Sequence, residues 1–130
     1  MVLAACNRLG IVTSVEIPVI NTITMSQKFS DNCVEMMKEM IYQCFNSPSV
    51  CIWAYMNEIM LRPLYNSESS IKKDEYLKYL YHIAERIENT AKEVDPGRAT
   101  MLPCHGNLAA YEEANLINLS DILGMNLYNG

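Results

Sequence analysis

The sequence has little of what several specialised classes of protein require. None of its apolar runs approaches the roughly 18 residues of a transmembrane helix, so we expect no membrane partner. Lys and Arg together number 10, against 15 Asp and Glu, which gives a net charge of −5. Because a nucleic-acid partner is bound through clustered positive charge, this balance argues against one.

Metal and cofactor motifs are also missing. The odd set of cysteines contains no C-x-x-C pair, whereas a zinc site uses paired spacing with histidine nearby. No glycine-rich phosphate-binding fingerprint follows any expected strand, which argues against a nucleotide cofactor. We therefore expect no metal and no cofactor, and free buried thiols at Cys6, Cys33, Cys44, Cys51 and Cys104.

What is present suits one soluble globular domain. Of the 130 residues, 50% are apolar and 19% are charged, which excludes a disordered chain. The length is nevertheless too short for a complete eight-unit α/β barrel, which needs about 250 residues.

Strand and helix signals alternate along the chain. A helical stub ends at Gly10, and the strands are expected at 11–17, 50–56, 99–102 and 121–127. Helices are expected between them at 31–44, capped by Ser30 or Asp31, and then at 74–94 and 108–115. Alternation of this kind predicts parallel strands with right-handed crossovers. Two α/β architectures fit: an open doubly wound sheet, or part of a (β/α)₈ barrel.

Two apolar patterns indicate where the core lies. Segment 50–56 is apolar without alternation, as in a strand buried on both faces, and we place Trp53 in the core. The helix at 31–44 carries a methionine-rich stripe that we interpret as a core face rather than an adaptable binding surface. That stripe consists of Cys33, Met36, Met37, Met40, Ile41 and Cys44.

Each expected strand carries polar residues at or just beyond its carboxyl end. These residues are Glu16, Asn57, Glu58, His105, Asn126 and Tyr128. A buried carboxylate costs several kcal/mol unless it is paired, hydrogen-bonded or solvated, so an ordinary strand has no need of one. Their recurrence predicts a polar cleft at this edge, where α/β folds carry their chemistry.

Glu58 is the most informative of these residues. It follows the apolar segment 50–56, so we expect partial burial to raise its pKa and to suit it as a general acid. Asn57 beside it offers one acceptor and two donors, which suits a sugar hydroxyl. The alternative is that Asn57 and Glu58 merely begin the loop after the strand.

Residues 46–58, N-S-P-S-V-C-I-W-A-Y-M-N-E, resemble the acid/base signature of glycoside hydrolase family 2. That family holds β-galactosidases, β-glucuronidases and β-mannosidases. Residues 8–18 resemble its third barrel strand, and residues 121–130 resemble its sixth. The sequence departs from the family pattern at Ser47, where His is usual, and at Asn7, where Asp is frequent.

The resemblance implies a fold and a set of roles. Residues 1–130 would form a single partial (β/α)₈ TIM-barrel fragment of about four parallel strands, acting on a carbohydrate by retaining hydrolysis of a terminal β-glycoside. Glu58 would be the catalytic acid/base, and Asn57 would bind the hydroxyl next to the anomeric carbon. Tyr128 would stand where the family has a tyrosine that orients the nucleophile. His105 and Glu16 would line the substrate cleft, with a purely structural hydrogen bond left open for His105.

A retaining glycosidase also needs a second carboxylate about 5–5.5 Å from the first. The family resemblance places this nucleophile on the seventh strand, outside these residues, although Glu16 is an alternative on the neighbouring strand. The isolated chain should then be nearly inactive, and its exposed sheet edges should favour self-association. Two other readings stay open: a non-catalytic carbohydrate-binding relic, and a self-contained α/β domain of unrelated function.

Overall fold

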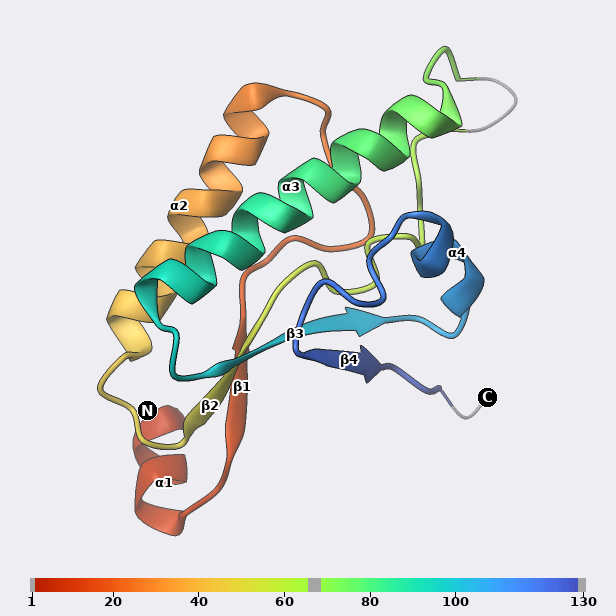
Figure 1. The fold of residues 1–130 in the computed structure, drawn as a ribbon. Coiled ribbons are helices and arrows are strands. Elements are labelled where there is room, and N and C mark those ends of the chain that lie inside the picture. Colours follow the sequence, from red (N-terminus) through yellow and green to blue (C-terminus); the bar gives the residue numbers. More distant parts are fainter. Residues whose placement is uncertain (1, 66–68, 129–130) are drawn as a thin grey trace.

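A computed structural model describes residues 2–65 and 69–128, and shows a four-stranded parallel sheet flanked by helices (Figure 1). None of its described helices is both long and apolar enough to cross a bilayer. Figure 1 shows the two long helices together on one side of the sheet. In chain order the elements are α1 (Val2–Leu9), β1 (Thr13–Glu16), α2 (Gln27–Cys44), β2 (Val50–Ala54), α3 (Lys73–Val94), β3 (Ala99–Cys104), α4 (Leu108–Glu113) and β4 (Ile122–Met125).

The strand order decides between the two expected architectures. The order in the sheet is β1-β2-β3-β4, and each strand pairs in parallel with the next one along the chain. A doubly wound sheet reverses its strand order at a switch point, whereas a barrel winds on in one direction. The fold is therefore the expected partial (β/α) barrel. In the described part of the chain, β1 and β4 are the two outer strands of the sheet, and each pairs with one neighbouring strand only.

Helix α2 begins one turn earlier than the sequence indicated. Its N-cap is Ser26, whose extended backbone (φ −146°, ψ 145°) lets its Oγ accept the N–H of Phe29 at 3.2 Å. Ser30, one of the two expected caps, is instead buried within the helix, where its Oγ accepts from Arg86 at 2.5 Å. The expectation of a cap at Ser30 or Asp31 was wrong. Ser26 and Ser30 are both residues that can cap a helix, and the contact of Ser30 with Arg86 of α3 places Ser30 inside the helix.

Strand β3 continues through a proline. The sequence predicted that this strand would end at residue 102, but it pairs with β4 as far as Cys104. Pro103 has no N–H to donate, which excludes it from most central strands. The proline is tolerated because the pairing of β2 with β3 ends at Ala54 and Met101. The N–H that Pro103 lacks would lie beyond this last residue pair, where no partner strand needs it.

The core lies between the sheet and the helices, as the apolar stripes predicted. Cys33, Met37 and Ile41 of α2 are buried, and Trp53 is completely buried in β2. All five cysteines are free, as expected, but only Cys33 and Cys104 are buried, whereas Cys6 and Cys44 are half-buried. Cys51 is exposed, which also contradicts the expectation of a strand covered on both faces. The register between β1 and β2 passes from Val50 to Ile52 and skips Cys51 at an irregularity.

A hydrogen-bonded cation fastens the amino-terminal end of the sheet. The Arg98 guanidinium donates to Asp95 Oδ2 at 2.6 Å and to the backbone oxygens of Val50 and Phe45 at 2.8 and 2.7 Å. The indole N–H of Trp53 donates to the same Asp95 oxygen at 3.1 Å. The guanidinium also lies 5.2 Å from the ring centre of Phe45 and 5.3 Å from that of Trp53. One side chain thus ties the ends of α2 and α3 to β2.

A buried carboxylate fastens the middle of the sheet to α3. Glu88 accepts the hydroxyl of Tyr55 at 2.8 Å and that of Thr100 at 2.9 Å. Burial raises the pKa of Glu88, and these two hydrogen bonds act in the opposite direction. Tyr55 is thereby fixed three residues before Glu58.

Replacing Arg98 tests the fastening at the amino-terminal end. We expect Arg98→Ala to lower the free energy of unfolding by about 3 kcal/mol, because Asp95 is left buried without its cation. Urea unfolding measures the loss. The matched control is Lys38→Ala, which removes an exposed ion pair with Glu35 and should cost less than about 1 kcal/mol. Equal losses in the two variants would contradict the assigned role of Arg98.

Candidate active site

The chain turns sharply as it leaves β2. Met56 and Glu58 have φ values of +60° and +52°, in the left-handed region that costs a residue with a side chain about 1–2 kcal/mol. The N–H of Glu58 donates to the carbonyl of Pro103 at 2.8 Å, which holds the turn against β3. Non-glycine residues in this conformation persist where their surroundings fix them, and they gather at functional sites.

The segment after β1 holds the other side of this turn. Ile20 forms an isolated parallel bridge with Asn57, and the N–H of Asn21 donates to the Asn57 carbonyl at 3.1 Å. The backbone on which Asn57 and Glu58 stand is therefore fixed from both neighbouring strands.

Two strand-end side chains donate hydrogen bonds to the carboxyl group of Glu58. The amide nitrogen of Asn126 donates to Asn57 Oδ1 at 2.8 Å and to Glu58 Oε1 at 3.0 Å. The hydroxyl of Tyr128 donates to the same Glu58 oxygen at 2.5 Å. Glu58 is only 6% exposed, so its carboxyl lies within the cluster and does not point into bulk solvent. The structure thus brings together Asn57, Glu58 and Tyr128: Asn126 bridges Asn57 and Glu58, and Tyr128 bonds directly to Glu58.

Asn126 is the residue whose role the sequence did not reveal. It was one of the polar strand-end residues, but nothing in the pattern linked it to Asn57 or Glu58. Its own N–H donates to the carbonyl of Cys104 at 2.8 Å, which sets its position at the end of β4.

The charge state of Glu58 differs from the expected one. We expected partial burial to raise its pKa, but the hydrogen bonds from Tyr128 and Asn126 lower it, with His105 acting in the same direction. Burial opposes this change and is outweighed. In this arrangement Glu58 is an ionised carboxylate near neutral pH, a proton acceptor and not a donor.

His105 lies beside the cluster, and Tyr111 of α4 contacts its ring. Its Nδ1 is 2.8 Å from the hydroxyl of Tyr111, and the two rings meet edge to face with centres 5.3 Å apart. The structural hydrogen bond that the sequence left open for His105 is therefore present. When its imidazole is protonated, His105 also lowers the pKa of Glu58.

Glu16 stands at the margin of the cluster. Burial raises the pKa of its carboxyl, and the backbone of Asn57 acts in the opposite direction, which places Glu16 next to Asn57. No hydrogen bond within residues 2–65 and 69–128 joins its carboxyl to Glu58. Over the same residues, no group of three His, Cys, Asp or Glu side chains is arranged to hold a metal ion.

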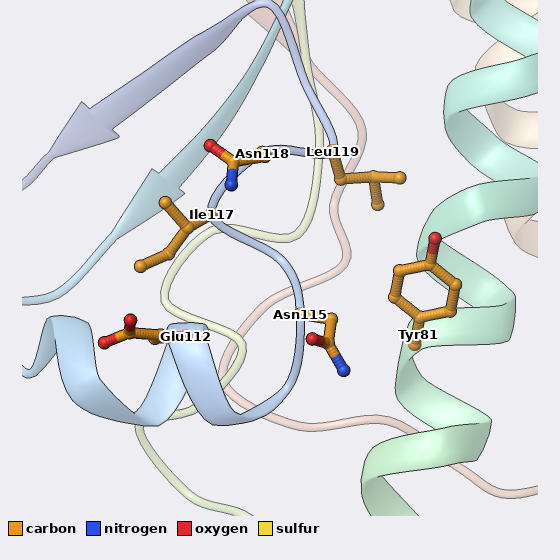
Figure 2. Close-up of a pocket in the computed structure, with 6 residues that line it drawn as sticks. All are labelled: Tyr81, Glu112, Asn115, Ile117, Asn118 and Leu119. Carbon is orange, nitrogen blue, oxygen red and sulfur yellow. The ribbon is translucent and has the colours of Figure 1, made fainter.

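A large hollow on the described part of the chain lies away from this cluster. Figure 2 shows it between α3 and the loop after α4, with a volume of about 680 Å³. It is lined by Tyr81, Glu112, Asn115, Ile117, Asn118 and Leu119. None of these belongs to the strand-end cluster, so the candidate site rests on converging chemistry and not on cavity size.

Known proteins of similar sequence and structure include several β-glucuronidases and a putative β-galactosidase of Bacteroides fragilis. The curated β-glucuronidase of Bacteroides fragilis is 29% identical over 128 residues, covering 93% of this chain and 16% of that protein. The crystal structure of Bacteroides uniformis β-glucuronidase superposes with a TM-score of 0.86 at 35% identity, covering 98% of this chain and 15% of that one. Parabacteroides merdae β-glucuronidase, at 22% identity, a TM-score of 0.77, and coverage of 99% and 14%, shares the fold. The chain spans about one sixth of the curated Bacteroides fragilis protein.

These similarities exclude the reading of an unrelated α/β domain. The two curated relatives are named β-glucuronidase and putative β-glucuronidase, whereas the sequence resemblance had put β-galactosidase forward as well. Residues 1–123 match the family model described as the TIM barrel domain of family 2 glycosyl hydrolases. With its four parallel strands in barrel order, the chain belongs to glycosyl hydrolase family 2 as part of that TIM barrel domain.

Proposed function

We propose that residues 1–130 form one partial-barrel domain of a retaining β-glycosidase in which Glu58 is the general acid/base. The observation that carries this proposal is the nearly buried Glu58 carboxyl, held by Asn126 and Tyr128 beside Asn57. The names of the relatives favour a terminal β-glucuronide as the carbohydrate substrate.

In the first step Glu58 gives its proton to the oxygen of the leaving group as the bond to the anomeric carbon breaks. A second carboxylate attacks that carbon and forms a covalent glycosyl-enzyme. In the second step Glu58 takes a proton from water, and the water oxygen displaces the enzyme carboxylate. Retention of the anomeric configuration follows from the two displacements.

The orientation of Asn57 suits a sugar hydroxyl. Because Asn126 donates to Asn57 Oδ1, the Asn57 amide nitrogen is left as a donor. We propose that it binds the hydroxyl next to the anomeric carbon. Glu16 and His105 would then line the substrate cleft on either side.

The lowered pKa of Glu58 has a consequence for this mechanism. A general acid must hold its proton near neutral pH, and a second carboxylate about 5–5.5 Å away would raise the pKa by repulsion. We propose that this nucleophile is supplied from outside residues 1–130. Tyr128 would then donate its hydrogen bond to the nucleophile instead of to Glu58. Without that hydrogen bond the pKa of Glu58 would rise, and Glu58 would keep its proton. Glu16 remains the alternative nucleophile, on the neighbouring strand.

The proposal is tested first by covalent labelling. We expect the isolated 130-residue chain to give no stoichiometric adduct with an activated 2-fluoro-glucuronide, because it lacks the nucleophile. Intact-mass spectrometry measures the adduct. In a longer polypeptide that includes these residues, Glu58→Ala should lower kcat about 10²–10⁴-fold for substrates with poor leaving groups. Azide should restore turnover in that variant.

Two outcomes would count against these assignments. Stoichiometric labelling of the isolated chain would assign the nucleophile to it, with Glu16 the first residue to examine. In the longer polypeptide, sugar binding without turnover would support a carbohydrate-binding relic over an enzyme. The matched control is Glu85→Ala on α3, away from the strand ends, which should leave kcat unchanged.

The hydrogen bond from Tyr128 makes a separate prediction about protonation. Tyr128→Phe removes the largest contribution that lowers the pKa of Glu58, so that pKa should rise toward its usual range. Carboxyl ¹³C NMR across a pH titration measures it in the isolated chain. Tyr42→Phe, at an exposed position of α2, is the control and should leave it unchanged. A Glu58 pKa that is the same in both variants would contradict the assigned hydrogen bond.

The sheet edges predict association of the isolated chain. β1 and β4 contain no lysine or proline that would discourage edge-to-edge pairing. Large apolar side chains also lie exposed beside both, with Val12 at 67% and Leu127 at 74%. We propose dimerisation or poor solubility, measured by sedimentation velocity at increasing concentration. A monodisperse monomer at tens of micromolar would contradict this.

A further inference from the structure

The contact between His105 and Tyr111 carries information about a proton. Tyr111 is completely buried, and it is the only buried residue of the short helix α4. Its hydroxyl oxygen lies 2.8 Å from Nδ1 of His105 and 3.3 Å from the backbone nitrogen of the same residue. Helix α4 thus places the hydroxyl of Tyr111 within hydrogen-bond distance of the His105 ring, beside the Glu58 cluster.

Counting donors and acceptors settles the direction of the ring contact. The backbone N–H of His105 already donates to the Tyr111 oxygen, which has one proton of its own to give. If Nδ1 also carried a proton and donated it, the phenolic proton would have no acceptor among the described residues. A buried hydroxyl without an acceptor costs about 1–3 kcal/mol. The opposite direction, from Tyr111 to Nδ1, satisfies the phenolic hydroxyl, Nδ1 and the backbone N–H of His105.

The acidity of the phenol is consistent with that direction. Burial raises the pKa of Tyr111 to about 12, while backbone hydrogen bonds from His105 and Met60 act the other way. The phenol therefore keeps its proton over the physiological range and remains able to donate it.

We propose that Tyr111 is a positioning residue, which donates its proton to Nδ1 of His105 and holds the neutral ring as the Nε2–H tautomer. The half-buried ring then presents an N–H donor at Nε2, for which the described residues provide no hydrogen-bond partner. Such a donor takes an oxygen acceptor, a sugar hydroxyl or carboxylate at the Glu58 cluster. That last statement rests on the proposed function, whereas the tautomer itself does not.

The tautomer can be read directly by NMR. The chain has two histidines, and the second, His82, is exposed on α3 and serves as an internal reference. In a chain labelled with ¹⁵N-histidine at about pH 8, where an ordinary imidazole is neutral, two-bond nitrogen-proton spectra identify the protonated nitrogen. We expect His105 to be more fully in the Nε2–H form than His82. A predominantly Nδ1–H ring at His105 would overturn the proposal.

Variants identify the cause of the preference. Tyr111→Phe keeps the ring and removes the hydroxyl, so the tautomer ratio of His105 should return to that of His82. Tyr42→Phe should leave it unchanged, and an unchanged ratio in Tyr111→Phe would overturn the proposal. Should that variant fail to fold, the ratio in the unmodified chain still decides. The NMR experiment measures no catalysis, so a negative result would not affect the proposed role of Glu58. A negative result of the labelling experiment would likewise not affect the assigned tautomer.

Discussion

One carboxyl oxygen, Oε1 of Glu58, links the segment that follows β2 to the segment that follows β4. It accepts hydrogen bonds from Asn126 and Tyr128, which lie 68 and 70 residues further along the chain. Two donors to one oxygen stabilise the ionised form strongly enough to outweigh burial. The same contacts fix Asn57 through Asn126, so the position and the charge of the central group have a common origin.

The two ends of the sheet divide the work of stability and chemistry. At the amino-terminal end Arg98 joins Asp95, Trp53 and the backbone of two elements. At the carboxyl end the backbone bears the unfavourable conformations of Met56 and Glu58. Strain at one end is tolerated because the other end and the buried hydrogen bond between Tyr55 and Glu88 hold the strands in place.

The lowered pKa of Glu58 bears directly on the proposed function. A glycosidase acid needs a proton that Glu58, with its lowered pKa, does not keep. Repulsion from a second carboxylate would supply the missing effect. The phenol of Tyr111, in contrast, has all its partners within the described residues and fixes His105 in either case.

The sequence by itself determined the alternation of strands and helices, the apolar stripe of α2, and the place of Asn57 and Glu58 at the end of β2. These features follow from local periodicity, and a residue such as Trp53 shows its burial through its neighbours in the chain. Local pattern also misled where alternatives were equivalent, since Ser26 and not Ser30 caps α2, and Cys51 is exposed.

Only the tertiary structure decided the direction of the Glu58 pKa, the bridging role of Asn126 and the partner of His105. The sequence shows that Glu58 is partly buried, but not that donors from a distant strand reach it. Burial raises the pKa of a carboxyl and hydrogen bonds lower it, and the balance depends on contacts made across the sheet. Those contacts exist because parallel strands bring their carboxyl ends to one edge, whatever the length of chain between them.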